Sequence, residues 1–341
     1  MPANRLAGME SPPHTRTDHA VKAYQFNSPD TGLELVDIDA PHPGPGQVLL
    51  DVEAAGMCQS DVHIVNGHGD DWLRKRPIVL GHEVAGTVRG RGPDVTEVEI
   101  GDRVAVALIS HPIEHADFAN AIGLGFDGGY ARQALAPVAN LVPIPAGVSF
   151  VQAAVATDSV ATAYHAVVTE AAIEIGMTVA IVGLGGLGLN GVRIAALQQA
   201  TVYGIDVDQT VFGDARAQGA VECFTALDDV PVALDAVIDF AGVGTTTADA
   251  VTVIKPGGRV VLVGLGAPEA TIATHQLVTK NIQLRGSIGA SIGELEAVLA
   301  LIAEGHLAPV LEEVDFGDLP AALARLQSGA VRGRLVTRPG A

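Results

Sequence analysis

A short apolar run that ends in three spaced glycines constrains the fold of this chain more than any other feature. Residues 178–182 (TVAIV) have the pattern of a buried strand, and Gly183-Leu-Gly185-Gly-Leu-Gly188 follows directly, ahead of a helical pattern. In such a context Gly183 permits a tight turn, Gly185 lets the backbone approach a pyrophosphate, and Gly188 allows close helix–strand packing. The helix N-terminus then offers free N–H groups to the phosphates. The stretch predicts the dinucleotide-binding turn of a parallel α/β sheet.

The second strand of this unit, residues 201–206 (TVYGID), ends in Asp206. Its carboxylate would accept hydrogen bonds from the adenosine ribose and would repel a 2′-phosphate. Residues 207–211 hold no Lys or Arg that would bind such a phosphate. We therefore expect NAD(H) rather than NADP(H). The alternative is a glycine turn in an α/β protein that binds no nucleotide.

Three sequence patterns follow one another along the chain. Residues 21–145 hold short alternating runs such as VLLDVEA (48–54) separated by Gly/Pro turns, which is typical of an antiparallel β domain. From 159 to 287, continuous apolar runs at 234–242 and 258–266 alternate with helical stretches at 190–200 and 247–255. That alternation predicts a doubly wound parallel sheet. The last segment, 288–341, predicts one helix (294–305), a polar loop and a terminal strand, and is too short for a separate domain.

Length and charge exclude several classes of protein. With 341 residues, two domains are expected. The chain has no apolar run of 18 residues, so an ordinary membrane-spanning helix is not predicted. A net charge of −19 would repel nucleic acids and anionic membranes, so neither is expected as a partner. Residues 1–20 are interpreted as a flexible tail. The chain has two cysteines, 165 positions apart, which make no disulfide framework and fit a reducing cytoplasm.

One of the two cysteines, Cys58, stands in the polar stretch GMCQSDVH (56–63), and His82 follows in GHEVAG (81–86). Catalytic zinc takes thiolate, imidazole and carboxylate ligands, three of them from the protein. Cys58 and His82 are two such donors from separate segments, and the residues alone do not identify a third.

Several motifs together resemble a known family. GxCxSDxHxxxG (56–67), GHEVAGTV (81–88), GDRV (101–104), DGGYA (127–131) and GLGGLG (183–188) occur in the order and spacing of the zinc-dependent alcohol dehydrogenases, within the medium-chain dehydrogenase/reductase superfamily. The resemblance covers about residues 21–338. It implies a GroES-like catalytic domain (21–158 and 288–341) and a Rossmann cofactor domain (159–287), with the active site between them.

The resemblance also implies a ligand set. In the family a cysteine usually supplies the third ligand, shortly before a Thr-x-Tyr step; here Asp158 stands four residues before Thr162. Asp158 is therefore expected to bind the single catalytic zinc with Cys58 and His82, although a helix-capping role is the alternative. Glu83 is expected behind the metal, as an alternate ligand or a group that tunes it.

Other roles are carried over by position. The resemblance makes Ser60 the first acceptor of the alcohol proton, which passes through the nicotinamide ribose to His63; the alternative is a helix cap and a surface histidine. Trp72, the single tryptophan, lies in the loop between the relay segment and His82 and is expected in the wall of the substrate pocket, because such loops often carry function; a packing role is the alternative. The residues that the resemblance implies at the cofactor, besides the three glycines and Asp206, are Thr162, Gly186, Leu187, Gly264, Leu265 and, at the pyrophosphate, Arg334.

The chain departs from the family between GDRV and DGGYA. Many members bind a structural zinc there through four cysteines, but residues 107–126 contain none, so no structural zinc is expected. His111 and His115, with Asp117 nearby, are interpreted as exposed loop residues rather than a replacement site, because Pro112 disfavours a regular helix. A homodimer or homotetramer is expected.

The predicted function is reversible transfer of a hydride between an alcohol and NAD, assisted by zinc. One alternative is a zinc-free reductase of the same superfamily, of the quinone or enoyl type and dependent on NADPH. Another is a nucleotide-binding protein without catalysis. The donor set and Asp206 count against the reductase, and the intact Cys58, Ser60 and His63 count against the protein without catalysis.

Overall fold

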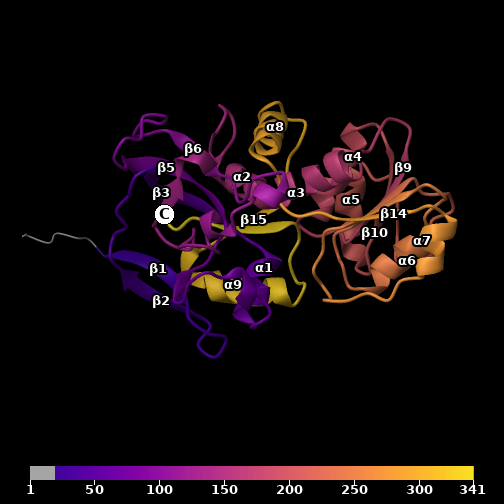
Figure 1. Cartoon of the computed structure of the whole chain (residues 1–341), viewed down its shortest axis with the longest axis horizontal. Coiled ribbons are helices and arrows are strands. Elements are labelled where there is room, and N and C mark those ends of the chain that lie inside the picture. The colour runs from indigo at the N-terminus through magenta and orange to yellow at the C-terminus, as the bar shows by residue number, and fades with distance from the viewer. Residues whose placement is uncertain (1–19, 341) are drawn as a thin grey trace, which may run out of the picture.

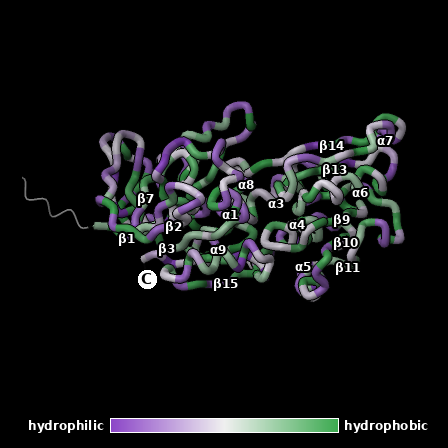
Figure 2. The backbone as a smooth tube through the Cα atoms, turned by 90° about the horizontal axis from the view of Figure 1, so that it is seen from below, coloured by the Kyte–Doolittle hydropathy of each residue, from purple (hydrophilic) through white to green (hydrophobic). Residues whose placement is uncertain are grey.

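The chain forms two lobes that lie side by side along its long axis, as Figure 1 shows for the computed structural model. The structure describes residues 20–340. The predicted tail therefore lies, apart from Ala20, outside the described residues. Hydrophobic stretches follow the interior strands of both lobes, and more hydrophilic segments lie in outer loops (Figure 2). No helix within residues 20–340 is long and apolar enough to cross a membrane.

The first lobe is built on strands that are antiparallel except for the parallel pair β15–β16, around an apolar core. Its larger sheet has the order β15 (Leu311–Val314), β16 (Arg334–Thr337), β3 (Gln47–Met57), β5 (Glu83–Arg91), β6 (Arg103–Val106), β8 (Leu141–Pro143), with β7 (Gln133–Pro137) also paired to β3. A smaller sheet has the order β2 (Leu33–Ile38), β1 (Val21–Phe26), β4 (Ile78–Val79). Inward residues alternate along β3, as expected for strands with one buried face.

The second lobe is a six-stranded parallel sheet covered by helices. Its order is β11 (Glu222–Phe224), β10 (Thr201–Ile205), β9 (Thr178–Val182), β12 (Ala236–Asp239), β13 (Arg259–Leu262), β14 (Gln283–Gly286). In chain order this is 3-2-1-4-5-6, the arrangement that places a dinucleotide across the point where strand order reverses. The helices are α4 (Gly188–Leu197), α5 (Phe212–Gln218), α6 (Thr245–Val253) and α7 (Thr274–Thr279). The predicted fold class, a β-rich lobe plus a doubly wound lobe, is confirmed.

A buried helical stretch joins the lobes in the middle of Figure 1. It runs through α2 (Phe150–Val155), a π-helical turn (Ala156–Val160), α3 (Ala161–Tyr164) and a second π-helical turn (His165–Glu170). The predicted boundary at residue 158 falls inside this stretch. Wide turns of this kind are frequent at functional sites. The domain limits at 158 and 288 stay our proposal.

The C-terminal segment contains more structure than the sequence predicts. The expected helix is α8 (Ile292–Ala303), which begins at a capping box formed by Ser291 and Glu294. The expected polar loop is wrong, because it contains β15 and α9 (Leu319–Gln327). The buried residues of α9 recur at helical spacing and form one face of the helix. The helix packs beside α1 (Gln59–Val65). Short 3-10 turns occupy Asp70–Trp72, Ile113–His115, Phe118–Asn120, Val138–Asn140, Gln209–Val211, Leu227–Asp229 and Phe316–Asp318.

Candidate metal and cofactor site

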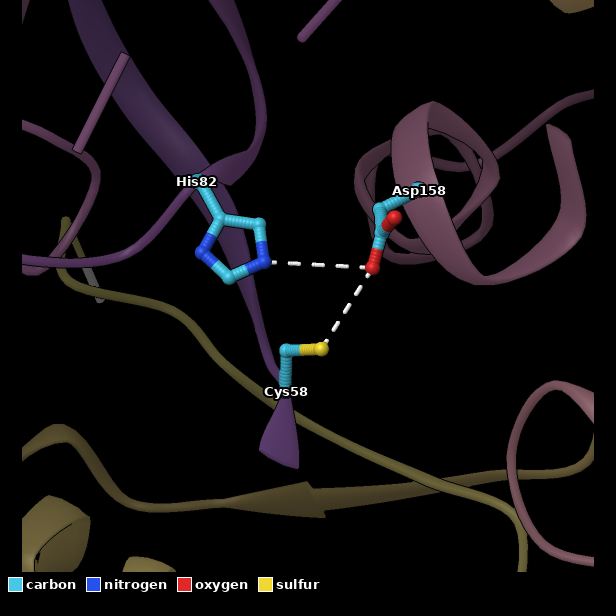
Figure 3. Close-up of side chains that lie close together, drawn as sticks. All are labelled: Cys58, His82 and Asp158. Atoms are coloured by element: carbon cyan, nitrogen blue, oxygen red, sulfur yellow. Dashed lines mark hydrogen bonds and ion pairs between the residues drawn. The ribbon is translucent and has the colours of Figure 1, made fainter. Parts of the chain in front are cut away.

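Three donor side chains from three parts of the chain meet between the lobes (Figure 3). Cys58 lies between β3 and α1, His82 directly precedes β5, and Asp158 lies on the first π-helical turn. The Cys58 Sγ is 3.5 Å from the Asp158 Oδ2, and the His82 Nε2 is 3.8 Å from that oxygen. All three residues are buried, and their donor atoms lie within 4.8 Å of one another.

These spacings fit a tetrahedral zinc ion. With bond lengths of about 2.3 Å to sulfur and about 2.0–2.2 Å to nitrogen or oxygen, tetrahedral ligand atoms stand roughly 3.3–3.6 Å apart. The two measured separations differ from that range by about 0.2 Å or less, which small side-chain rotations would close. Three protein ligands also leave a fourth position for a substrate oxygen. Residues 20–340 contain no other group of three His, Cys, Asp or Glu side chains gathered in this way.

Asp61 holds two of the three donors in place. Its Oδ1 is 3.3 Å from the Nδ1 of His82, the ring nitrogen that faces away from Asp158. Its Oδ2 accepts hydrogen bonds from the Cys58 N–H (3.0 Å) and the Tyr130 hydroxyl (2.8 Å). A carboxylate behind a metal-binding histidine fixes the ring and its tautomer. Sequence reasoning missed this role of Asp61, for which the SDxH spacing beside Cys58 was the available signal.

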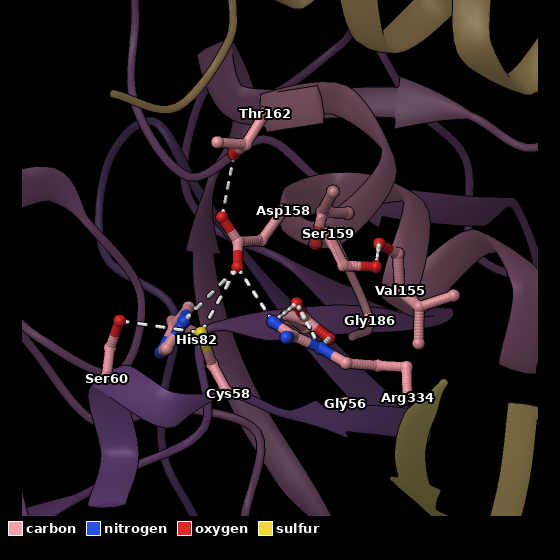
Figure 4. Close-up of polar contacts among 12 residues, drawn as sticks. Gly56, Cys58, Ser60, His82, Val155, Asp158, Ser159, Thr162, Gly186 and Arg334 are labelled. Carbon is pink, nitrogen blue, oxygen red and sulfur yellow. Dashed lines mark hydrogen bonds and ion pairs between the residues drawn. The ribbon is translucent and has the colours of Figure 1, made fainter. Parts of the chain in front are cut away.

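Arg334 links the donor set to a second buried acid, Glu83. Figure 4 shows the Arg334 guanidinium beside Asp158. Its Nη2 donates to the Asp158 Oδ2 at 2.9 Å, and its Nε donates to both Glu83 carboxylate oxygens at 3.1 and 3.2 Å. Glu83 thus faces Arg334 and is not among the gathered donors. A Cβ placed on Gly186 would lie 3.2 Å from the Arg334 Cδ, so the same side chain also borders the glycine turn.

Burial and charge set the protonation of this cluster. Burial raises the pKa of Glu83 to about 8, although the charge of Arg334 opposes this. Burial also disfavours ionised Asp158, but its contact with His82 and the charge of Arg334 lower its pKa overall. Burial opposes a charged His82, yet the Asp61 carboxylate raises the pKa of the imidazole well above its usual value. Before metal binds, the proton therefore resides on His82, and Asp158 is an ionised donor.

The predicted relay residues lie at different depths. The Ser60 Oγ is 3.4 Å from the Cys58 Sγ and lines the pocket beside the donors. Thr162 donates a 2.8 Å hydrogen bond from its hydroxyl to the Asp158 Oδ1. His63 is half-buried and outside the pocket lining, with its ring centroid 6.4 Å from those of His68 and Trp72. Burial, and then the charge of His68, lower the pKa of His63.

A pocket of about 430 Å³ opens over the donor set. Its volume lies within the range for small-molecule sites. Trp72 is part of its wall, where sequence analysis expected it, and Leu265 and Leu187 border it from the cofactor lobe. The other apolar side chains around it are Leu108, Ile109, Phe118, Leu124, Val263 and Ile288. The lining is therefore mainly apolar, and its polar members besides the donor set are Ser60, Asp71, Arg74, Thr162 and Ser287.

The glycine turn has the shape that its sequence predicts. Gly183 has φ of +81°, and a Cβ on Gly188 would lie 1.7 Å from the Gly183 carbonyl oxygen. By contrast, a Cβ on Gly185 would meet no atom within 4 Å, so open space lies where a pyrophosphate is expected. The Asp206 Oδ2 accepts a 2.7 Å hydrogen bond from the Leu184 N–H, which orients the carboxylate at the end of β10. Gly264 lies against the backbone of residues 240–241.

The two loop histidines differ. His115 is exposed, as expected. His111 is half-buried, and its Nε2 is 2.9 Å from the Ile288 carbonyl oxygen. The prediction of an exposed loop position is therefore wrong for His111, because tertiary contacts with Ile288 and with the His165 ring cover part of its side chain.

Comparisons with known proteins agree with this arrangement. Residues 44–146 match the alcohol dehydrogenase GroES-like domain, and residues 186–304 match the zinc-binding dehydrogenase family. An alcohol dehydrogenase of Geobacillus stearothermophilus is 30% identical over 92% of this chain and 97% of its own length.

Two solved structures share the whole architecture. The acetophenone reductase of Geotrichum candidum, solved in complex with NAD, is 34% identical with a TM-score of 0.87, covering 94% of this chain and 98% of that one. A cobalt- and zinc-bound thermostable alcohol dehydrogenase from Pyrobaculum aerophilum is 28% identical with a TM-score of 0.86, covering 94% and 100%. Together with the fold and the buried Cys–His–Asp set, these likenesses show that the chain belongs to the zinc-dependent alcohol dehydrogenase family of the medium-chain dehydrogenase/reductase superfamily.

Proposed function

We propose that this chain is an NAD-dependent alcohol dehydrogenase that interconverts small alcohols with their aldehydes or ketones at one catalytic zinc. The observation that carries the proposal is the meeting of Cys58, His82 and Asp158 on the floor of a pocket that Leu187 of the glycine turn also borders. The donors and the cofactor turn thus face the same chamber, as hydride transfer requires.

Cys58, His82 and Asp158 are the residues that would hold the metal. Thiolate and carboxylate together balance the two charges of Zn²⁺, while His82 binds as the neutral imidazole with Asp61 behind it. Zinc, when bound, would supply a Lewis acid for the substrate oxygen, and NAD would supply the hydride acceptor. Glu83 is proposed to tune the metal site indirectly, through its contact with Arg334. Arg334 is also proposed to contact the pyrophosphate, because its side chain borders Gly186 in the glycine turn.

Ser60 and His63 are the proposed proton carriers. The Ser60 hydroxyl lines the pocket beside the Cys58 sulfur, within reach of a substrate oxygen above the donors. His63 is half-buried and has a lowered pKa, so it is neutral near neutral pH and accepts a proton. Thr162 orients Asp158 and lines the nicotinamide side of the pocket.

The nucleotide is proposed to be NAD rather than NADP. The Asp206 carboxylate already accepts the N–H groups of Leu184 and Asp208, which fixes its orientation where the adenosine ribose is expected. No cation follows within residues 207–211. Gly185 and Gly186 would receive the pyrophosphate at the turn that Gly188 packs closely, and Gly264 and Leu265 would line the nicotinamide.

The substrate is proposed to be a small apolar alcohol or ketone. The chamber walls are aliphatic and aromatic, including Trp72 and Phe118, and acetophenone is the substrate in the name of one similar structure. An aromatic ketone fits such walls without burying an unpaired polar group.

One experiment separates this function from a zinc-free, NADPH-dependent quinone or enoyl reductase. Protein purified without chelator is analysed for metal, titrated with NADH and NADPH by fluorescence, and assayed with acetone, acetophenone and a benzoquinone. We expect about one zinc per chain, tighter binding of NADH, and ketone reduction that a chelator abolishes. A metal-free protein that prefers NADPH and reduces the quinone would contradict the proposal.

A homodimer or homotetramer in the cytoplasm completes the proposal. All four residues of β14 are exposed at the edge of the cofactor sheet, and Val278, which precedes β14 in the chain, is an exposed apolar residue. An open edge of this kind pairs readily with another strand. Cys58 and Cys223 are free thiols, which suits a reducing compartment. Analytical ultracentrifugation that finds only monomer at micromolar concentration would rule out the assembly.

A further inference from the structure

A pair of histidines in close, tilted ring contact lies beside the pocket wall, outside the donor set. His111 follows β6 in the first lobe, and His165 begins the second π-helical turn. Their ring centroids are 4.2 Å apart, with an angle of 38° between the planes. The His111 Nε2–H donates to the Ile288 carbonyl oxygen at 2.9 Å, so the contact spans 177 residues of sequence.

The His165 ring, which the His111 ring contacts, is held in a fixed position. It is only 4% exposed, and its Nδ1 lies 2.9 Å from the Glu294 Oε1, while its Nε2 lies 3.5 Å from the Glu170 Oε1. Glu294 also closes the capping box of α8 and accepts a hydrogen bond from the Thr169 hydroxyl. Burial opposes the charge of Glu294, but the bonds from His165 and Thr169 lower its pKa to about 2. The carboxylate therefore stays ionised and keeps the His165 ring in place.

The other partner of His111 is a wall of the pocket. Ser287, Ile288 and Gly289 connect β14 to α8, and all three line the chamber. Ile288 is 49% exposed, so burial of its own side chain does little to hold it. Gly289 has φ of +56°, and a Cβ there would lie 2.4 Å from the Ile109 side chain. Segment 287–289 is thus held against segment 108–111 by one close apolar contact and one hydrogen bond.

We propose that His111 is a positioning residue that holds the Ser287–Gly289 wall against the first lobe and so sets the width of the substrate chamber. The inference rests on the proposed function, because it treats this chamber as the substrate site. It also assigns a role to part of the cysteine-free segment 107–126. A replacement metal site does not explain these contacts, since within residues 20–340 only Cys58, His82 and Asp158 gather as donors.

The test separates the donor of His111 from its ring. His111→Phe keeps a flat ring but loses the N–H, whereas His111→Gln keeps a donor of similar reach but loses the ring. His115→Phe and His115→Gln are matched controls, because His115 lies in the same loop, is exposed, and makes no polar side-chain contact within the described chain. Each zinc-loaded variant is assayed with NADH and either acetone or acetophenone, and its melting temperature is measured.

Loss of the donor should widen the chamber. For His111→Phe we expect the KM for acetone to rise about threefold to tenfold, the range for one lost hydrogen bond, with kcat within about twofold. The preference between acetone and acetophenone should change, and His111→Gln should restore both values to within about twofold of the wild type. Unchanged KM and preference in His111→Phe would overturn the proposal, as would equal damage to stability, kcat and KM in both variants.

Hydrogen–deuterium exchange gives a readout that does not depend on turnover. In the zinc- and NADH-loaded protein, His111→Phe should speed amide exchange in peptides covering residues 283–292, and His115→Phe should not. If the wild type lacked ketone reductase activity while this difference persisted, the proposed function would be wrong, but the role of His111 in holding segment 287–289 would be supported. Equal exchange in the two variants would contradict that role of His111.

Discussion

Replacing Asp158 with asparagine should remove zinc from the protein while leaving its shape. The side chain keeps its size, but the site loses one of its two anionic donors. Arg334 then stands beside the site without that counter-charge, since its Nη2 is 2.9 Å from the Asp158 Oδ2. Glu83 still pairs with the guanidinium, so the loss of folding stability should be modest.

The size of the effect follows from the number of ligands. Zinc binding to four-ligand structural sites is worth about 10–16 kcal/mol, or roughly 2.5–4 kcal/mol for each ligand. Losing one donor should therefore weaken zinc binding by about 10²- to 10³-fold. The nearby charge of Arg334 moves the expectation toward the larger value.

The assay is competition with a chelator of known zinc affinity, read out by metal analysis, alongside turnover with NADH and acetophenone. Asp158→Asn should lose zinc and activity together, while NADH fluorescence titration remains close to the wild type. Asp158→Cys is the matched control, because it restores an anionic donor and should hold zinc more tightly than the asparagine variant. An Asp158→Asn protein that kept both its zinc and its turnover would refute the ligand assignment.

Three further outcomes are expected. Asp206→Ala should weaken NADH binding about tenfold or more and reduce the preference over NADPH, which paired fluorescence titrations would detect. Gly185→Val should leave the melting temperature nearly unchanged, because open space surrounds that position, yet abolish NADH binding; Gly188→Ala should instead destabilise the fold. His68 contributes to the lowered pKa of His63. Because oxidation needs neutral His63, its rate is retained down to that lowered pKa, and His68→Gln should move the acid limb of the pH profile to higher pH.

Sequence reasoning predicted the parts of the molecule whose signals are local. The strands β9, β10, β12 and β13 are continuous apolar runs, and the glycine turn and the Cys58 segment are contiguous motifs. β15 was missed because LEEV is short and polar at the edge of its sheet. α9 was missed because the helix has only nine residues, and Ala and Pro between its four buried residues weaken the contrast between its two faces.

Contacts between residues that are far apart in the chain could not be predicted from the sequence. Asp61 and His82 are separated by 21 positions, and Arg334 meets Glu83 across 251 positions. The ring contact between His111 and His165 likewise depends on the tertiary fold. From the sequence alone, His111 could therefore not be distinguished from an exposed loop histidine.

X-ray absorption at the zinc edge would test the proposed metal centre in solution. For zinc-loaded protein we predict one sulfur neighbour at about 2.3 Å and nitrogen or oxygen neighbours at about 2.0–2.2 Å, one of them an imidazole. The spectrum should lose this first shell in Asp158→Asn. A bound zinc without any sulfur neighbour would contradict the account, because the metal would then lie away from Cys58.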